Sequence, residues 1–189
     1  MGGDAVERLR TEVDAIRRAA GRLPVPRIAS VDEHARVVTF SYVAGRHGQE
    51  LIEEGRAGRV LERAGEVLRA LHAGSSSARL HGDFGPQNLL YDPHTLDVVA
   101  VLDWEFARDG DPVEDLAWAE WIVRMHHPPA VGHLESLFHG YGEEPRWARR
   151  RTAMIAACER HEKRARTLAD LPAADLWARR AHVTAHWEP

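Results

Sequence analysis

The segment HGDFGPQN, residues 81–88, holds side chains whose types and spacing could do chemistry. Asp83 comes five residues before Asn88, and a further aspartate, Asp103, ends an apolar run downstream. A carboxylate beside an attacking hydroxyl can orient it and accept its proton. A second carboxylate and a carboxamide offer the oxygen ligands that Mg²⁺ prefers. The pattern predicts phosphoryl transfer, with Asp83 as the base and with Asn88 and Asp103 as ligands of Mg²⁺.

A predicted hairpin gives the two metal ligands a reason to converge. The runs NLLY (88–91) and VVAVLDW (98–104) are short and apolar, and the DPHTLD segment between them begins with the turn signal Asp-Pro. Asn88 would begin one strand and Asp103 would end its partner. We therefore expect the hairpin to bring these two side chains together.

Helices account for most of the remaining chain. Residues 4–20 carry Val6, Leu9, Val13 and Ile16 at spacings of three and four, which predicts a helix with one apolar face. Strands are predicted at 27–31 and 36–43, and a loop at 44–49. The pattern predicts further helices at 56–73, 112–126, 131–140, 146–168 and 172–184.

Three motifs in this order resemble the aminoglycoside phosphotransferase / choline kinase family, small-molecule relatives of the protein kinases. HGDFGPQN is similar to the catalytic loop of that family, LDWE (102–105) to its metal-binding segment, and GDPVEDLAW (110–118) to the segment that follows. A lone HxDxxxxN would be a weak signal, but several motifs in the right order are specific. The resemblance implies an α+β, protein-kinase-like fold: a mostly helical C-lobe with a short catalytic hairpin, and a reduced N-terminal lobe.

The resemblance also implies roles for residues other than Asp83, Asn88 and Asp103. Asp115 corresponds to an aspartate that braces the catalytic loop. His81 is predicted to be a structural brace that shapes this loop by hydrogen bonding, with a role as a base as the alternative. Glu12 lies at the position of the ion-pairing glutamate of the lobe helix, although an exposed helix glutamate is an equal alternative. The segment VVTFSYVAG resembles the hinge, so the backbone of Phe40, Tyr42 and Val43 would hold the base of ATP or GTP.

The resemblance fails at the phosphate clamp, by which we mean the Gly-rich loop and the lysine that hold the phosphates of the nucleotide. The family has a Gly-rich loop and a strand lysine before the glutamate, whereas the one lysine here is Lys163. We therefore expect an N-terminal lobe, residues 1–45, without the Gly-rich loop and its lysine strand, followed by a helical C-lobe at 46–189. Arg8 or Arg10 could replace the lysine, although a guanidinium fork is not equivalent to an ammonium group.

The acceptor is predicted to be a small hydroxylated molecule, such as an aminoglycoside. Glu105 and Asp109 are candidate substrate contacts, with solvated surface positions as the alternative. Trp118, Trp121 and Trp177 are predicted to pack between helices, or else to line the acceptor pocket.

Composition excludes some classes of partner. The net charge is −4, so the chain lacks the basic excess of a nucleic-acid-binding protein. No apolar run is long enough to span a membrane, no signal peptide is evident, and Cys158 is the single cysteine. These features predict a cytoplasmic protein. A homodimer would cover strand edges near residues 26–43.

Two functions from different classes remain open. One is a Mg²⁺-dependent small-molecule kinase that moves the γ-phosphoryl group of a nucleotide to a hydroxyl. The alternative, suggested by the missing clamp, is a catalytically inactive kinase-like module that binds a ligand or a partner protein.

Overall fold

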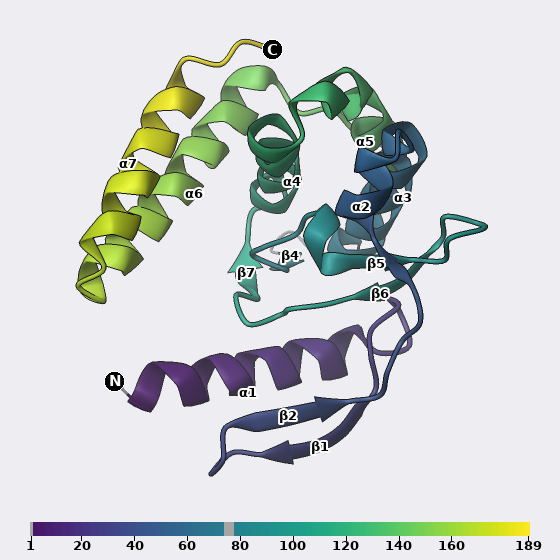
Figure 1. The fold of residues 1–189 in the computed structure, drawn as a ribbon, viewed down its shortest axis with the longest axis vertical. Helices are drawn as coiled ribbons and strands as arrows, with labels where there is room; N and C mark the ends of the chain where they lie inside the picture. The colour runs from purple at the N-terminus through teal and green to yellow at the C-terminus, as the bar shows by residue number, and fades with distance from the viewer. Residues whose placement is uncertain (1, 74–77) are drawn as a thin grey trace.

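The N-terminal part is one helix packed against a two-stranded hairpin. The computed structural model describes residues 2–73 and 78–189 (Figure 1). Helix α1 (Gly2–Ala19) buries Leu9, Val13 and Ile16, as its apolar spacing predicts. Strands β1 (Ile28–Asp32) and β2 (Val37–Phe40) pair antiparallel. Figure 1 shows α1 lying between this hairpin and the rest of the chain.

Helices form the larger C-terminal part, and all but the short α2, which was not predicted, lie close to the predicted positions. They are α2 (Gly48–Glu53), α3 (Ala57–His72), α4 (Val113–His126), α5 (Leu134–Tyr141), α6 (Trp147–Thr167) and α7 (Leu171–Ala185). Helix α3 packs on α5, α4 on α6, and α6 on α7. The predicted helix at 131–140 begins later, because residues Pro128–His133 form a 3₁₀ helix before α5. None of the described helices is both long and apolar enough to cross a membrane.

Short strands connect the helices and carry the predicted hairpin. Strands β5 (Leu89–Tyr91) and β6 (Val98–Val101) pair antiparallel, with Leu89 opposite Val101. A third strand, β3 (Arg46–His47), pairs with β5. A separate pair joins β4 (Ala78–Leu80) to β7 (Arg108–Gly110). The catalytic loop lies between β4 and β5, so two small sheets fix its ends.

The prediction of a loop at 44–49 was wrong. Arg46 and His47 form β3, and α2 begins at Gly48. The polar residues of this stretch suggest a loop, but the Nδ1 atom of His47 hydrogen-bonds the carbonyl of Gln87 at 2.8 Å. A Cβ atom at Gly48 would come within 2.7 Å of the Tyr91 ring. Long-range pairing with the catalytic hairpin therefore decides the structure here, and local sequence does not show it.

Helix α4 positions the site because it is buried on almost every side. Its hydrophobic residues enter two cores. Leu116, Ala119 and Val123 pack into the main core, and Trp118 and Trp121 pack into a second core with α6. The buried residues of α4 include Val113 and the whole run 115–123, so neighbouring elements cover nearly every side of the helix. The first turn of α4, which carries Glu114 and Asp115, is thereby held against the catalytic loop.

Candidate active site

The carboxylate of Asp83 is held from two sides. The indole Nε1 of Trp118 donates a 2.7 Å hydrogen bond to Oδ1 of Asp83. The Nδ2 atom of Asn88 donates to Oδ2 of Asp83 at 3.1 Å and to its backbone oxygen at 2.9 Å. Burial raises the pKa of Asp83 and outweighs these donors, which lower it. The group is therefore fixed in direction and more basic than an ordinary aspartate, which suits a proton acceptor.

Asp115 holds the backbone of the catalytic loop from α4. Its side chain is 1% exposed and accepts the N–H groups of His81 at 2.7 Å and Gly82 at 2.9 Å. The Nε2 atom of His72 lies 3.2 Å from the same carboxylate. Burial alone would raise the pKa of Asp115, but His72 and the loop donors lower it below its usual value. A buried, ionised carboxylate thus fixes the residues directly before Asp83.

His81 connects the catalytic loop to the second strand of the hairpin. The backbone N–H of Asp83 donates to Nδ1 of His81 at 3.2 Å, so the ring proton lies on Nε2 and faces the carbonyl of Leu102 at 2.9 Å. The ring is fully buried and its centroid lies 4.6 Å from that of Trp104. This ring has no access to a substrate, and its contacts are those of a positioning residue.

The hairpin brings the two predicted metal ligands to the same place. The backbone N–H of Leu102 donates to the carbonyl of Asn88 at 2.9 Å, so Asp103 follows directly beside Asn88. Asp103 is exposed and has a left-handed φ of 61°, which turns the chain out of β6. The sequence argument for convergence is thus matched by the register of β5 and β6.

The donor set fits a hard divalent cation. Among the described residues, the Asn88 side chain hydrogen-bonds through Nδ2, so its amide oxygen would be the coordinating atom. The carboxylate of Asp103 is exposed beside it. An amide oxygen and a carboxylate are ligands that Mg²⁺ accepts, with water and phosphate oxygens completing its shell.

Helix α1 lies against the LDWE segment, residues 102–105. Glu12 accepts the backbone N–H of Trp104, and burial, with the charges of Asp103 and Glu105, raises the pKa of Glu12. Arg8 reaches the same segment and pairs with Glu105 at 3.0 Å. Arg10 pairs instead with Glu33 at 2.6 Å. Of the two arginines considered as replacements for the lysine, Arg8 is the one beside the LDWE segment.

The remaining candidates lie further from Asp83. Phe40 ends β2 opposite Ile28, and the chain then runs without regular structure through Tyr42, which is 90% exposed, and Val43. Asp109 lies in β7, is exposed, and is 3.5 Å from Arg79. The hinge and substrate roles of these residues stay predictions.

A cavity of about 370 Å³ opens beside Asp83. Its lining is mostly aromatic and comes from α2, α4 with the residue after it, α6, α7 and the catalytic loop: Gln49, Asp83, Gln87, Trp118, Trp121, Ile122, His126, His127, His161 and Trp177. Trp118 stacks on Trp121 with centroids 4.5 Å apart, and His161 stacks on Trp177 at 4.3 Å. The tryptophans therefore pack between helices and also line this cavity. That an acceptor binds here stays a prediction, and we call the cavity the acceptor cavity after that prediction.

Sequence reasoning did not place six of the lining residues at this cavity: Gln49, Gln87, Ile122, His126, His127 and His161. It also missed one role, that of Trp118 as a donor to Asp83. Gln87 belongs to the HGDFGPQN motif, whereas Gln49 and His161 lie in segments without a motif that would place them beside Asp83. Among the described residues, the buried Oε1 atom of Gln87 has no hydrogen-bond partner, as expected of a group that faces a ligand. Trp118 as a donor to Asp83 had a signal, because it lies three residues after Asp115 on one helix face.

Replacing Trp118 with phenylalanine should shift the pH dependence of the reaction. The indole N–H stabilises the ionised form of Asp83, so its loss should raise the pKa of that carboxyl further. The acid limb of the rate profile should then move to higher pH, with a smaller change at the alkaline end. A profile that falls uniformly at every pH would contradict this role and indicate a packing defect.

A known family model matches the segment that carries these motifs. Residues 74–154 match the model of the phosphotransferase enzyme family. A mouse protein, acyl-CoA dehydrogenase family member 10, is 48% identical over 40 residues, which are 21% of this chain and 4% of that protein. The chain therefore spans only a small part of the length of its first curated relatives, and the match concerns one segment.

Solved structures show the fold over nearly the whole chain. A choline/ethanolamine kinase family protein from Mesorhizobium loti superposes with a TM-score of 0.72 at 19% identity, covering 95% of this chain and 79% of that one. A thermostable aminoglycoside phosphotransferase APH(4)-Ia variant, in a ternary complex with AMP-PNP and hygromycin B, gives 0.70 at 15% identity, with 94% and 81% covered. The predicted protein-kinase-like fold and the resemblance to the aminoglycoside phosphotransferase / choline kinase family are confirmed.

Proposed function

We propose that this chain is a small-molecule kinase of that family, which moves the γ-phosphoryl group of ATP or GTP to a hydroxyl group with the help of Mg²⁺. The observation that carries the proposal is the state of Asp83. Its carboxylate is oriented by Trp118 and Asn88, has a raised pKa, and lines a cavity large enough for a small acceptor.

In this reaction Asp83 would accept the proton of the acceptor, and Asn88 and Asp103 would bind the cation. The acceptor hydroxyl oxygen forms a bond to the γ-phosphorus, the bond from that phosphorus to the β,γ-bridging oxygen breaks, and the hydroxyl proton passes to Asp83. Asn88 and Asp103 would hold the cation, which neutralises phosphate charge. Phosphoryl transfer needs mainly such positioning and charge.

Binding of nucleotide is the first test. At a concentration about 100 times its Kd, AMP-PNP with Mg²⁺ should stabilise the protein by about 2.7 kcal/mol, which raises the melting temperature by roughly 5–10 °C in a chain of this size. EDTA and the Asp103→Ala variant should each remove most of this shift. Asp97→Ala is the matched control, because Asp97 is also exposed and lies directly before β6 of the same hairpin.

Two outcomes of the same experiment separate the rival functions. If no Mg²⁺-dependent shift occurs with ATP or GTP analogues, the kinase proposal fails. If the shift occurs but radiolabelled nucleotide is never hydrolysed or transferred, the chain is an inactive kinase-like module. The contacts of Glu12 favour this second candidate, because its carboxylate accepts the backbone N–H of Trp104 and lies beside the charges of Asp103 and Glu105.

A further inference from the structure

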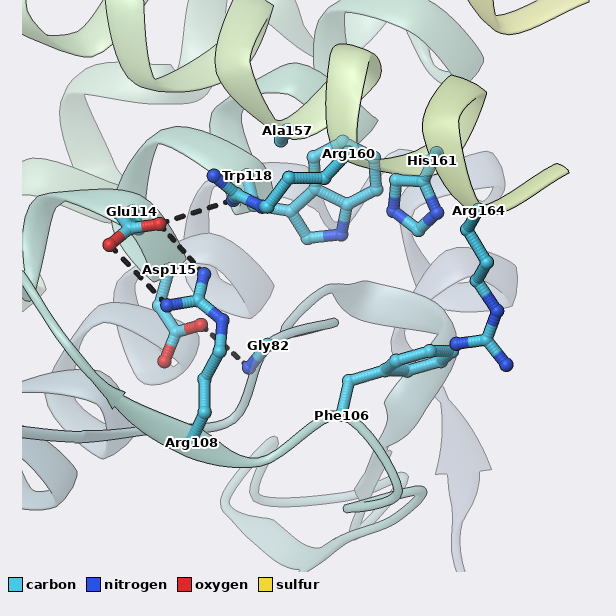
Figure 2. A pocket seen from close by; sticks show the side chains of 10 residues that line it. All are labelled: Gly82, Phe106, Arg108, Glu114, Asp115, Trp118, Ala157, Arg160, His161 and Arg164. Carbon is cyan, nitrogen blue, oxygen red and sulfur yellow. Dashed lines mark hydrogen bonds and ion pairs between the residues drawn. The ribbon is translucent and has the colours of Figure 1, made fainter. Parts of the chain in front are cut away.

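A second, smaller cavity lies on the other side of Trp118. It has a volume of about 170 Å³ and is lined by Gly82, Phe106, Arg108, Glu114, Asp115, Trp118, Ala157, Arg160, His161 and Arg164 (Figure 2). It shares Trp118 and His161 with the acceptor cavity, and Gly82 is the neighbour of Asp83. A molecule with one group beside Asp83 could therefore place another group here.

The lining of this second cavity holds more basic than acidic side chains. Three guanidinium groups, from Arg108, Arg160 and Arg164, belong to its lining. Asp115 also lines it, but that carboxylate already accepts two backbone N–H groups and contacts His72. The charge of Asp115 is thus committed to the catalytic loop.

Glu114 is the carboxylate that forms ion pairs with two of these arginines. Its Oε2 atom lies 2.7 Å from Arg108 and 3.1 Å from Arg160, so one carboxylate is shared by two guanidinium groups. The side chain of Arg160 is 48% exposed. Each guanidinium carries five N–H donors in a planar fork suited to carboxylate and phosphate, so this pair has donors left for a further anion.

Arg164 lies on the opposite side of the cavity. Its guanidinium carbon is 4.9 Å from the centre of the Phe106 ring, and Figure 2 shows it far across the opening from Glu114. Between these groups stands His161. Burial and the charges of Arg160, Arg164 and Arg180 lower its pKa to about 4, so the ring is neutral at pH 7. The cavity therefore presents an excess of positive charge beside the candidate base.

We propose that this second cavity, lined by Arg108, Arg160 and Arg164, binds a carboxylate or phosphate group of the acceptor, whose hydroxyl lies at Asp83. The inference rests on the proposed kinase function and names its substrate class: a hydroxylated anion. A polycationic acceptor such as an aminoglycoside would place ammonium groups against guanidinium groups here, which is unfavourable.

Direct binding of inorganic phosphate and of acetate tests the cavity without knowledge of the acceptor. Calorimetry should detect binding of phosphate both to the protein alone and to the protein saturated with AMP-PNP and Mg²⁺. Arg160→Gln should weaken binding about tenfold, since a hydrogen bond to a charged group is worth about that factor. Glu114→Gln should strengthen it, because the competing carboxylate is gone. Arg166→Gln is the control, on the same helix but paired with Glu162.

The ring of His161 reports where the anion binds. Its NMR signals, assigned with a His161→Gln variant, should move on addition of phosphate, and its pKa should rise because an anion favours the protonated ring. Phosphate binding that leaves these signals unmoved would lie elsewhere and would overturn the proposal, as would the absence of binding. A response to phosphate and not to acetate would select a phosphorylated acceptor, and the reverse a hydroxy acid.

Transfer assays keep this inference separate from the proposed function. The acceptors are propane-1,3-diol, its monophosphate, 3-hydroxypropanoate and 3-aminopropan-1-ol, with radiolabelled ATP. Faster transfer to either anion than to the diol or the amine, lost in Arg160→Gln, is the expected result. Preference for the amine or the diol would overturn the anionic class while leaving the kinase intact. If the protein binds no nucleotide but does bind phosphate near His161, the kinase proposal is contradicted and the anion site is still supported.

Discussion

Asp83→Asn should lower Mg²⁺-dependent turnover of ATP by about 10²–10⁴-fold, the range that a positioned general base contributes. The carboxylate lines the acceptor cavity and is aimed by Trp118 and Asn88. An amide keeps the size of the side chain but cannot accept the proton of a hydroxyl. Initial rates at saturating nucleotide measure the effect, with water as acceptor until a better one is found.

Stability separates this loss from misfolding. Because burial raises the pKa of Asp83, its ionised form is disfavoured in the folded state, and the fold loses stability as pH rises from the unfolded to the folded pKa. Removal of the charge at pH 7 should offset the lost hydrogen bond from Asn88, so the variant should melt near the parent temperature and still bind nucleotide. Asp97→Asn, at an exposed position paired with Arg63, should leave turnover unchanged. Undiminished turnover in Asp83→Asn would remove Asp83 from the mechanism.

The sequence predicts the parts of the site that lie on one continuous stretch. Asp83, Asn88 and Asp103 are joined by a single hairpin, so a turn signal and two apolar runs suffice to bring them together. Asp115 follows closely, in the first turn of a helix whose hydrophobic residues are buried in two cores. Local periodicity and short-range turns determine these elements, so they lie close to the predicted positions. The strands are shorter than predicted, because β5 begins at Leu89, after Asn88, and β6 ends at Val101, before Asp103.

The acceptor side could not be predicted in the same way. His161 lies on α6 and Gln49 on α2, and each reaches the cavity through packing between distant helices. The shared carboxylate of Glu114 likewise depends on Arg160 from α6 and Arg108 from β7. No spacing in the sequence encodes such contacts. The same holds for β3, whose polar residues become a strand only through pairing with β5.

Asp115→Ala should have the largest effect on stability, a loss of about 2–6 kcal/mol in the free energy of unfolding. The substitution leaves the buried N–H groups of His81 and Gly82 without their acceptor, and each unsatisfied buried group costs about 1–3 kcal/mol. Chemical denaturation at pH 7 measures the loss. Asp109→Ala, at an exposed position, should change stability by less than about 0.5 kcal/mol. An equal effect of the two substitutions would contradict the bracing role of Asp115.

The pH dependence of that loss identifies its cause. His72 and the loop donors hold the pKa of Asp115 below its usual value, so its contribution is present in full above the unfolded pKa of about 3.9 and is lost as pH falls through the folded value. The difference in stability between the parent protein and Asp115→Ala should therefore be constant near neutral pH and become smaller below about pH 4. A cavity left by a missing side chain would cost the same at every pH. A difference in stability that becomes smaller only at acidic pH would therefore show that Asp115 stabilises the backbone of the catalytic loop through its ionised carboxylate.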